Sequence, residues 1–214
     1  MLNMVKYVVI TRVYYIWGVT IFLYIGLYYL LNGPDFISFI DNNTRKSIPY
    51  DYIKEYGYEL KENKPEKYKK MFKELEDILR KDTVSDEEYV KKAAEMFVYD
   101  FYSLEDKTAK TDVGGVNFVL PEALPNFLAN AEDTYYKYVE SNLYGERKQI
   151  LPIVDTVTLV STTPTEYVYN TKKYTAYEIK TTWTYTDTKF SNYQSSATLI
   201  FVKDGIKFYL AELQ

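Results

Sequence analysis

The chain has 214 residues, of which 47% are hydrophobic and 26% are charged, and its formal net charge is -4. This balance is typical of a globular protein, because disordered chains carry fewer apolar residues and a larger charge imbalance. It also argues against a nucleic-acid-binding surface, which needs clustered basic residues. The chain contains neither Cys nor His. Disulfides, thiolate catalysis, Ser-His-Asp triads and His-ligated metals are therefore excluded, and we expect no cofactor.

The N-terminal region contains an uncharged segment long enough to cross a membrane. No charged residue occurs from Val13 to Asn32, and Gly33-Pro34 ends the segment. A helix from Tyr14 to Leu31 would rise about 27 Å, close to the ~30 Å hydrocarbon thickness of a bilayer. A buried core helix is the alternative, but both faces of this segment are apolar. We therefore predict a transmembrane helix over residues 13–32, with an anchor that includes Arg12, Val13, Trp17, Gly18, Gly26 and Leu31.

The charges that flank this segment predict its orientation. Lys6 and Arg12 precede it, whereas Asp35 and Asp41 come before any base on the far side. The positive-inside rule then places residues 1–12 in the cytoplasm and the rest of the chain outside the cell membrane. A cleaved signal peptide is the rival interpretation, but its apolar core would be shorter and would end at small residues. Gly18 and Gly26 share one helix face, which could admit a second helix.

After the predicted anchor, we expect a connector over residues 33–63 and three helices in the domain that follows. Pro49 and Gly57 argue against one long regular element in the connector. An apolar stripe predicts a helix from Pro65 to Arg80. Ser85 with Glu88 forms a capping box that starts a second helix. A third is expected to follow Pro125 and to end near Gly145, with these residues directed toward a core: Phe127, Ala131, Tyr135 and Tyr138.

The C-terminal part has the twofold periodicity of β-strands. We expect strands over Val154–Val160, Tyr174–Thr186, Ser195–Val202 and Ile206–Leu213, with Tyr167–Tyr169 either extending the first or starting another. Asp204-Gly205 is a strong hairpin signal between the last two. Helices first and strands afterwards predict an α+β domain over residues 64–214, with helices on one face of a curved antiparallel sheet. One face of the long strand would form a core or a pocket wall, with core favoured: Tyr177, Ile179, Trp183 and Tyr185.

This order of elements resembles the single-pass scaffold subunit of type IV secretion and conjugation systems, in the form found in Gram-positive conjugative elements. The resemblance is architectural and extends from Arg12 to Leu213, with Asp112–Phe118 and the hairpin Lys203–Lys207 as its most family-like segments. It implies a nuclear-transport-factor-2-like cone fold and a non-enzymatic role in DNA transfer. It also implies homo-oligomerisation, contacts with other secretion-channel proteins and with the membrane, and no direct contact with nucleic acid. Some relatives carry two such domains, whereas this chain has room for one.

Two other functions stay open at this stage. A cone-fold isomerase or dehydratase would need an acid or base such as Asp100, Glu178, Tyr177 or Tyr185. However, we expect Glu178 on the polar face of its strand and Asp100 on an exposed helix face. A membrane-tethered ligand-binding or cell-wall-associated domain of the same fold is the other alternative. The glycines of the loop Asp112–Val116 could also hold an anion, although a plain turn is the simpler interpretation.

Overall fold

The computed structural model describes residues 49–214, so the predicted tail and the transmembrane helix at residues 13–32 lie outside the described residues. None of the helices within residues 49–214 has the length and apolarity needed to span a bilayer. The folded unit runs from Pro49 to Gln214. It therefore begins before residue 64, where we expected the domain to start, and it includes a part of the expected connector.

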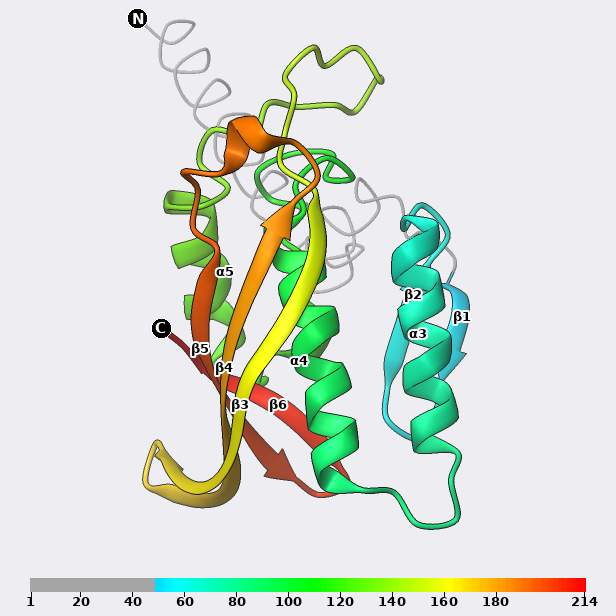
Figure 1. The fold of residues 1–214 in the computed structure, drawn as a ribbon, viewed down its shortest axis with the longest axis vertical. Coiled ribbons are helices and arrows are strands. Elements are labelled where there is room, and N and C mark those ends of the chain that lie inside the picture. Colours follow the sequence, from blue (N-terminus) through cyan, green and yellow to red (C-terminus); the bar gives the residue numbers. More distant parts are fainter. Residues whose placement is uncertain (1–48) are drawn as a thin grey trace, which may run out of the picture. The chain divides into compact units, whose positions relative to one another are not determined.

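The described unit is an α+β fold with three α-helices and a four-stranded antiparallel sheet (Figure 1). A two-stranded hairpin precedes the helices, and the two short 3-10 helices lie in loops. In chain order the elements are β1 (Pro49–Ile53), β2 (Tyr58–Lys61), α3 (Glu66–Leu79), α4 (Asp86–Tyr102), η1 (Val116–Phe118), α5 (Leu124–Asp133), β3 (Val154–Tyr169), β4 (Lys172–Tyr185), η2 (Thr188–Phe190), β5 (Ser196–Asp204) and β6 (Lys207–Leu213).

The first two helices begin where the sequence predicts. Pro65 precedes α3 with a φ of -56°, and the Ser85 hydroxyl accepts a hydrogen bond from the Glu88 amide at 3.3 Å at the start of α4. Both residues favour a helix start, because proline needs no N–H there and serine satisfies a free one. The helix starts predicted from Pro65 and from the Ser85 capping box are confirmed.

The third helix is shorter than expected. It ends at Asp133, and Thr134 leaves the helical region with φ -119° and ψ -90°. Beyond it the chain turns so that Tyr136 enters the core, where its hydroxyl donates to the Phe101 carbonyl at 2.6 Å. Tyr138 is 77% exposed, so the prediction that it faces the core is wrong. A tertiary hydrogen bond made by Tyr136 replaces the continuation of the helix.

The sheet is an antiparallel meander in the order β3-β4-β5-β6. Tyr167–Tyr169 belong to the first strand, which is therefore continuous over 16 residues. The hairpin at Asp204-Gly205 is confirmed, with Asp204 paired to Lys207 and Gly205 at φ +62°. In the four-stranded sheet β3 pairs only with β4, but its register shifts twice and it contains Pro164. Bulges and proline protect an edge strand from pairing with other chains.

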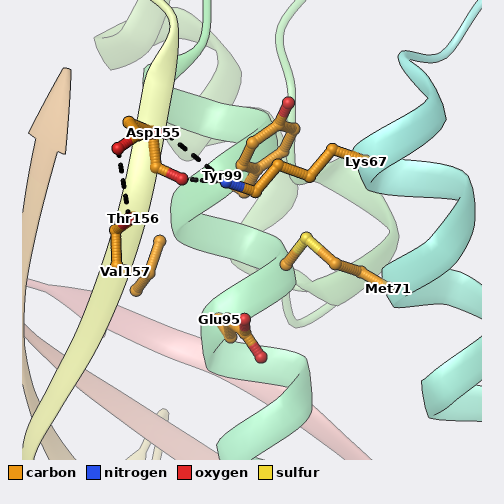
Figure 2. Close-up of a pocket in the computed structure, with 7 residues that line it drawn as sticks. All are labelled: Lys67, Met71, Glu95, Tyr99, Asp155, Thr156 and Val157. Atoms are coloured by element: carbon orange, nitrogen blue, oxygen red, sulfur yellow. Dashed lines mark hydrogen bonds and ion pairs between the residues drawn. The ribbon is translucent and has the colours of Figure 1, made fainter. Parts of the chain in front are cut away.

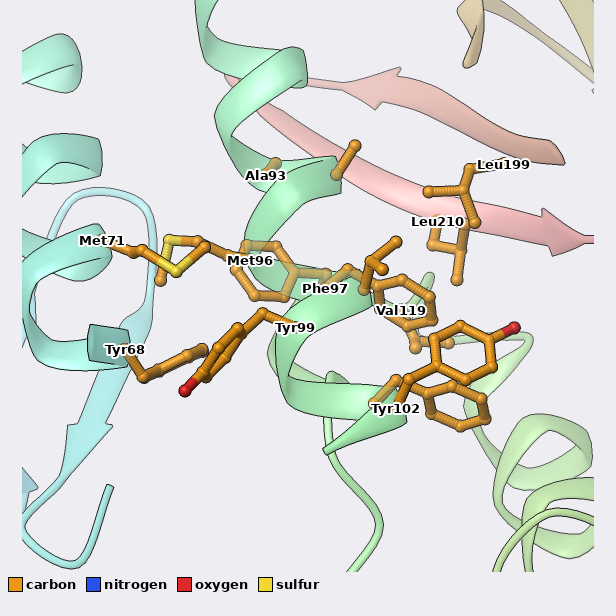
Figure 3. Close-up of a cluster of buried hydrophobic side chains, with 14 of the residues drawn as sticks. Tyr68, Met71, Ala93, Met96, Phe97, Tyr99, Tyr102, Val119, Leu199 and Leu210 are labelled. Carbon is orange, nitrogen blue, oxygen red and sulfur yellow. The ribbon is translucent and has the colours of Figure 1, made fainter. Parts of the chain in front are cut away.

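Helix α4 lies between the four-stranded sheet and α3 (Figure 1). Figure 3 shows how it serves both sides: Met96 and Tyr99 lie toward Met71 and Tyr68 of α3, while Phe97 and Tyr102 lie toward the sheet. This is why eleven of its residues, from Tyr89 to Tyr102, are buried. A helix buried all round is the one that its neighbours pack against. The β1–β2 hairpin adds Tyr58 and Leu60 to the same core.

A smaller apolar cluster covers the opposite face of the sheet. Because successive strand residues point to opposite faces, Leu199 and Phe201 of β5 join the main core while Ile200 and Val202 join this second cluster. Leu120 and Tyr174 complete its buried part. Leu120 also donates its amide to the Leu210 carbonyl at 2.9 Å, along the outer side of β6.

Candidate functional site

Four charged side chains gather at the C-terminal end of α4, where we expected an exposed helix face. Asp100 of α4 lies 2.8 Å from the Lys107 ammonium and also binds Lys64. Asp106 binds the same two lysines, at 2.7 Å from Lys107 and 3.1 Å from Lys64. All four side chains are at most 12% exposed. The expectation that Asp100 is exposed is therefore wrong, and we call Lys64, Asp100, Asp106 and Lys107 the charge cluster.

The loop Asp112–Val116, which we call the glycine loop, lies against the charge cluster. The Gly115 amide donates to the second carboxylate oxygen of Asp100 at 2.8 Å, and the Gly114 amide donates to the Tyr136 hydroxyl at 3.0 Å. A Cβ on Gly114 would lie 2.1 Å from the Asp100 carbonyl oxygen, and Gly115 has φ +73°. Neither position therefore accepts a larger residue without movement of the backbone. Of the two glycine amides, only that of Gly115 contacts an anion, and that anion is the carboxylate of Asp100.

The electrostatics of the charge cluster fix the protonation of Asp100. Burial by itself raises the pKa of this carboxyl, but the positive charges of Lys107 and Lys64 and their hydrogen bonds lower it well below its usual range. For Lys107, burial lowers the pKa of the ammonium, and Asp100 and Asp106 raise it above its ordinary value. The carboxylate is thus ionised at neutral pH, and it accepts hydrogen bonds from Lys64, Lys107 and the Gly115 amide. A carboxylate with a strongly lowered pKa is a weak proton acceptor at neutral pH.

The other predicted acid, Glu178, lies on the outer face of β4. Its carboxylate is 41% exposed and its nearest base is Lys180, 3.6 Å away. Asp100 and Glu178 therefore lie in separate environments, one in the charge cluster and one on the sheet face opposite the main core. The structure does not bring them together into one site.

The predicted wall on β4 faces the main core. Ile179 and Trp183 are buried there, and Tyr177 and Tyr185 pack against the same cluster while partly exposed. The Trp183 ring lies 4.1 Å from the ring of Tyr102, centroid to centroid. The Tyr185 hydroxyl lies 3.0 Å from that of Tyr135 and donates to the Gln194 carbonyl at 2.6 Å. Aromatic rings from α4 and from the segment after α5 thus fill the space in front of this wall.

A small pocket opens where α3, α4 and the start of β3 meet (Figure 2). Its volume is about 90 Å³, and it is lined by Lys67, Met71, Glu95, Tyr99, Asp155, Thr156 and Val157. The Lys67 ammonium binds the Asp155 backbone carbonyl, lies 3.9 Å from the Asp155 carboxylate and lies 5.7 Å from the Tyr99 ring centroid. No residue of this pocket was singled out from the sequence, because its parts come from three separate elements. The pocket could hold a few atoms of a ligand, such as a small polar group.

A lysine at the start of β6 differs from those of the charge cluster. Lys207 is 8% exposed, and no acid or hydrogen-bond acceptor contacts its ammonium within residues 49–214. Its nitrogen lies 4.0 Å from the ring centroid of Tyr58 and 5.0 Å from that of Tyr209. Burial lowers its pKa to about 8. Two aromatic faces thus take the place of a carboxylate around this cation.

Comparison with other proteins adds no further assignment, because no protein-family model, curated protein or solved structure matches the chain.

Proposed function

We propose that the protein is a non-enzymatic, membrane-anchored structural subunit of a conjugative type IV secretion channel, which acts through homo-oligomerisation and through contacts with other channel proteins. The uncharged segment at residues 13–32 supports the anchor. The described α+β unit, with its helices, the antiparallel meander and the C-terminal hairpin, is compatible with a nuclear-transport-factor-2-like cone. The assignment to a secretion channel, and the partners expected there, rest on the architectural resemblance.

The state of Asp100 is the observation that carries the non-enzymatic part of the proposal. An acid that serves as a general base must be able to take up a proton near the working pH. In this protein Asp100 contacts two lysines and a backbone amide, and its pKa is lowered. Its partners are all used to hold α4, the glycine loop and the segment that carries Lys107 in one arrangement. Asp100, the strongest candidate for a general base in the sequence, therefore supports the packing of the domain.

A membrane-tethered ligand-binding or cell-wall-associated domain is the second candidate, and the pocket beside Lys67 favours it. A cone-fold isomerase or dehydratase ranks below both. The three functions make different demands on the same side chains. A ligand-binding domain needs the pocket beside Lys67, an enzyme needs an acid, a base or a tyrosine hydroxyl, and a scaffold needs only the anchor and the folded domain.

Transfer of DNA from a donor strain that lacks the gene tests the proposal. The full chain should restore transfer, whereas the anchor alone and a fragment without residues 1–33 should not, because contact requires both parts in one molecule. Glu178→Gln and Tyr185→Phe variants with normal membrane levels should retain transfer within a few fold. Loss of a general acid or base typically lowers activity by ~10²–10⁴-fold. A well-folded, abundant variant with a loss of that size and unchanged partner crosslinks would replace the scaffold by an enzyme.

A further inference from the structure

A loop between α5 and β3 exposes large apolar side chains. We call residues 138–150 the tip loop; Figure 1 shows it as the yellow-green arch at one end of the unit. Tyr138 is 77% exposed, Leu143 67%, Tyr144 89% and Ile150 68%. Single exposed apolar residues are ordinary on protein surfaces, but four in thirteen positions form a group.

A buried arginine fixes the backbone of the tip loop. The side chain of Arg147 is 1% exposed, and its guanidinium donates to the carbonyls of Lys107 and Glu105, each at 2.7 Å. The Asn142 amide donates to the Thr108 carbonyl at 2.7 Å. Both limbs of the tip loop are thus tied to residues 105–108, beside the charge cluster. The exposure of its apolar side chains is a property of an ordered loop.

A glutamine joins the two limbs at their base. The Gln149 side chain accepts from the Glu140 amide at 2.9 Å and donates to the Tyr138 carbonyl at 2.8 Å. Between the limbs, the Gly145 amide donates to the Asn142 carbonyl at 3.1 Å and closes a turn that carries Leu143 and Tyr144. These two side chains therefore lie at the end of a braced turn.

The size of this apolar group decides between possible occupants. The two tyrosines can each present about 150–250 Å², and Leu143 and Ile150 present less, so the four residues offer on the order of 500 Å². A stable protein interface needs about 800 Å² from each partner and a matching surface. A lipid bilayer needs no matching shape, and tyrosine is favoured at its interface. The apolar group is thus small for a protein partner and adequate for a membrane surface.

The charges around the tip loop are mixed. Lys137 and Lys148 are exposed, and Lys148 has no acceptor within the described part of the chain. Glu140 and Glu146 are exposed as well. These charges nearly cancel, so contact with a membrane would depend on insertion of apolar side chains more than on anionic headgroups.

We propose that the tip loop inserts Leu143 and Tyr144 into the outer interface of the lipid bilayer. This inference rests on the proposed function, because the anchor holds the domain beside the membrane. Two side chains alone would give only weak, reversible binding. A tethered domain meets the bilayer at a high effective concentration, so a weak contact is sufficient. The insertion would fix the orientation of the domain on the membrane and leave its other surfaces free for channel proteins.

The absence of Cys makes a direct test possible. A spin label is placed by Tyr144→Cys in the full chain, reconstituted in vesicles of phosphatidylcholine with and without phosphatidylglycerol. Oxygen concentrates in lipid and a nickel chelate in water, so their effects on the label report its depth. The matched control is Ile206→Cys, which is 57% exposed in the β5–β6 turn, at the other end of the unit (Figure 1). At position 144 we expect oxygen to relax the label several-fold more than the nickel chelate, and the reverse at position 206.

Two results would overturn the proposal. One is a label at position 144 that is as accessible to the nickel chelate as the label at position 206. The other is a label at position 144 shielded from both agents, with spin–spin broadening that disappears when unlabelled chain is added, since this would assign the loop to a second copy. Carbonate extraction of the same vesicles separates the two proposals. A chain that resists extraction but has a water-exposed tip loop refutes only the loop insertion, whereas an extractable chain refutes the anchor of the proposed function.

Discussion

The charge cluster and the tip loop invert the usual distribution of side chains in opposite ways. In the charge cluster, Asp100 and Lys107 carry full charges at buried positions. In the tip loop, Leu143 and Tyr144 carry apolar surface into water. Buried charges are tolerated when they are paired and hydrogen-bonded, and here each has at least two partners. The tip loop offers no such compensation within the described chain, which is why its apolar residues suggest a partner and the buried charges do not.

The two regions are also joined. The segment Glu105–Thr108 contributes Asp106 and Lys107 to the charge cluster, and its carbonyls receive Arg147 and Asn142 of the tip loop. The charge cluster holds this segment in place, and the segment holds the tip loop. Damage to the charge cluster should therefore reach the tip loop, whereas changes at Leu143 or Tyr144 should leave the charge cluster intact.

The largest effect is expected from Lys107→Met. This change keeps most of the side-chain volume but leaves Asp100 with one buried cation instead of two. Breaking a buried ion pair typically costs about 3–5 kcal/mol of the free energy of unfolding, because a buried charge loses its compensation. Urea titrations of the full chain in mild detergent, followed by circular dichroism, would measure the loss. Lys91→Met is the control, since its pair with Glu87 is largely exposed and should contribute less than about 1 kcal/mol.

The stability difference between the native chain and Lys107→Met should depend on pH. The pKa of Asp100 is lowered in the folded protein, so its contribution to stability is present above the unfolded value of about 4 and is lost as the pH falls through the folded value. The difference between the native chain and Lys107→Met should therefore shrink below about pH 4. A constant difference from pH 7 to pH 3 would mean that Lys107 acts through packing and not through its charge.

A smaller loss of the free energy of unfolding is expected from Gly114→Ala. The new Cβ would meet the Asp100 backbone carbonyl at 2.1 Å, so the glycine loop must move away from α4. Such overpacking costs about 1–3 kcal/mol. Gly57→Ala provides the comparison, because the new Cβ would meet no atom within 4 Å and the change costs only the strain of the positive φ of Gly57, +64°, a conformation that Gly114 does not share. Thermal unfolding of both variants should show the larger decrease for Gly114→Ala. Equal decreases would show that the contact with α4 does not matter.

Arg147→Met should loosen the tip loop more than it destabilises the whole domain. The variant loses the hydrogen bonds to the carbonyls of Glu105 and Lys107. Hydrogen bonds from a charged donor each stabilise a structure by about 1.5–3 kcal/mol, and here they stabilise the tip loop. Hydrogen exchange should increase at residues 138–150 and remain unchanged in β4 and β5. If exchange rises equally across the sheet, Arg147 supports the fold as a whole and the tip loop is not a separate unit.

The smallest effect is expected at Lys207, the buried cation that has no acid. Burial lowers its pKa, so the folded protein favours the neutral amine and its charge opposes folding at neutral pH. Lys207→Met should leave stability unchanged or raise it by about 1 kcal/mol at pH 7, since the contacts with two tyrosine rings offset part of the cost. Any gain should disappear as the pH rises from about 8 to 10. A loss comparable to that of Lys107→Met would mean that Lys207 has a compensating partner.

Some of these features could be read from the sequence because their causes are local. Ser85 and Glu88 are three residues apart, and Asp204-Gly205 is a two-residue signal, so the helix start and the hairpin follow from neighbouring residues. The facing of Ile179 and Trp183 follows from the twofold repeat of a strand. In each case, the interaction that decides the structure lies within a few residues of chain.

The environment of Asp100 could not be read in this way. Its partners are Lys64, Lys107 and Gly115, and two of them lie 15 and 36 positions away. Next to Tyr99 and Tyr102, an acid on a helix is most simply interpreted as exposed. Only the packing of α3, the glycine loop and α4 shows that this face is buried. It also shows that Lys64, before α3, and Lys107, after α4, compensate the charge.

The sequence by itself determined the α+β class, the starts of α3 and α4, the four strands of the meander and the hairpin at Asp204-Gly205, and it predicts the anchor at residues 13–32, because each depends on local periodicity or on a short motif. The tertiary structure alone decided that β1 and β2 belong to the domain, that α5 ends at Asp133, and that the tip loop is braced with its apolar side chains outward. Each of these outcomes depends on a contact between distant residues, such as Tyr136 with Phe101 or Arg147 with Lys107. A local sequence pattern does not reveal such a distant partner, because the two residues come into contact only in the folded chain.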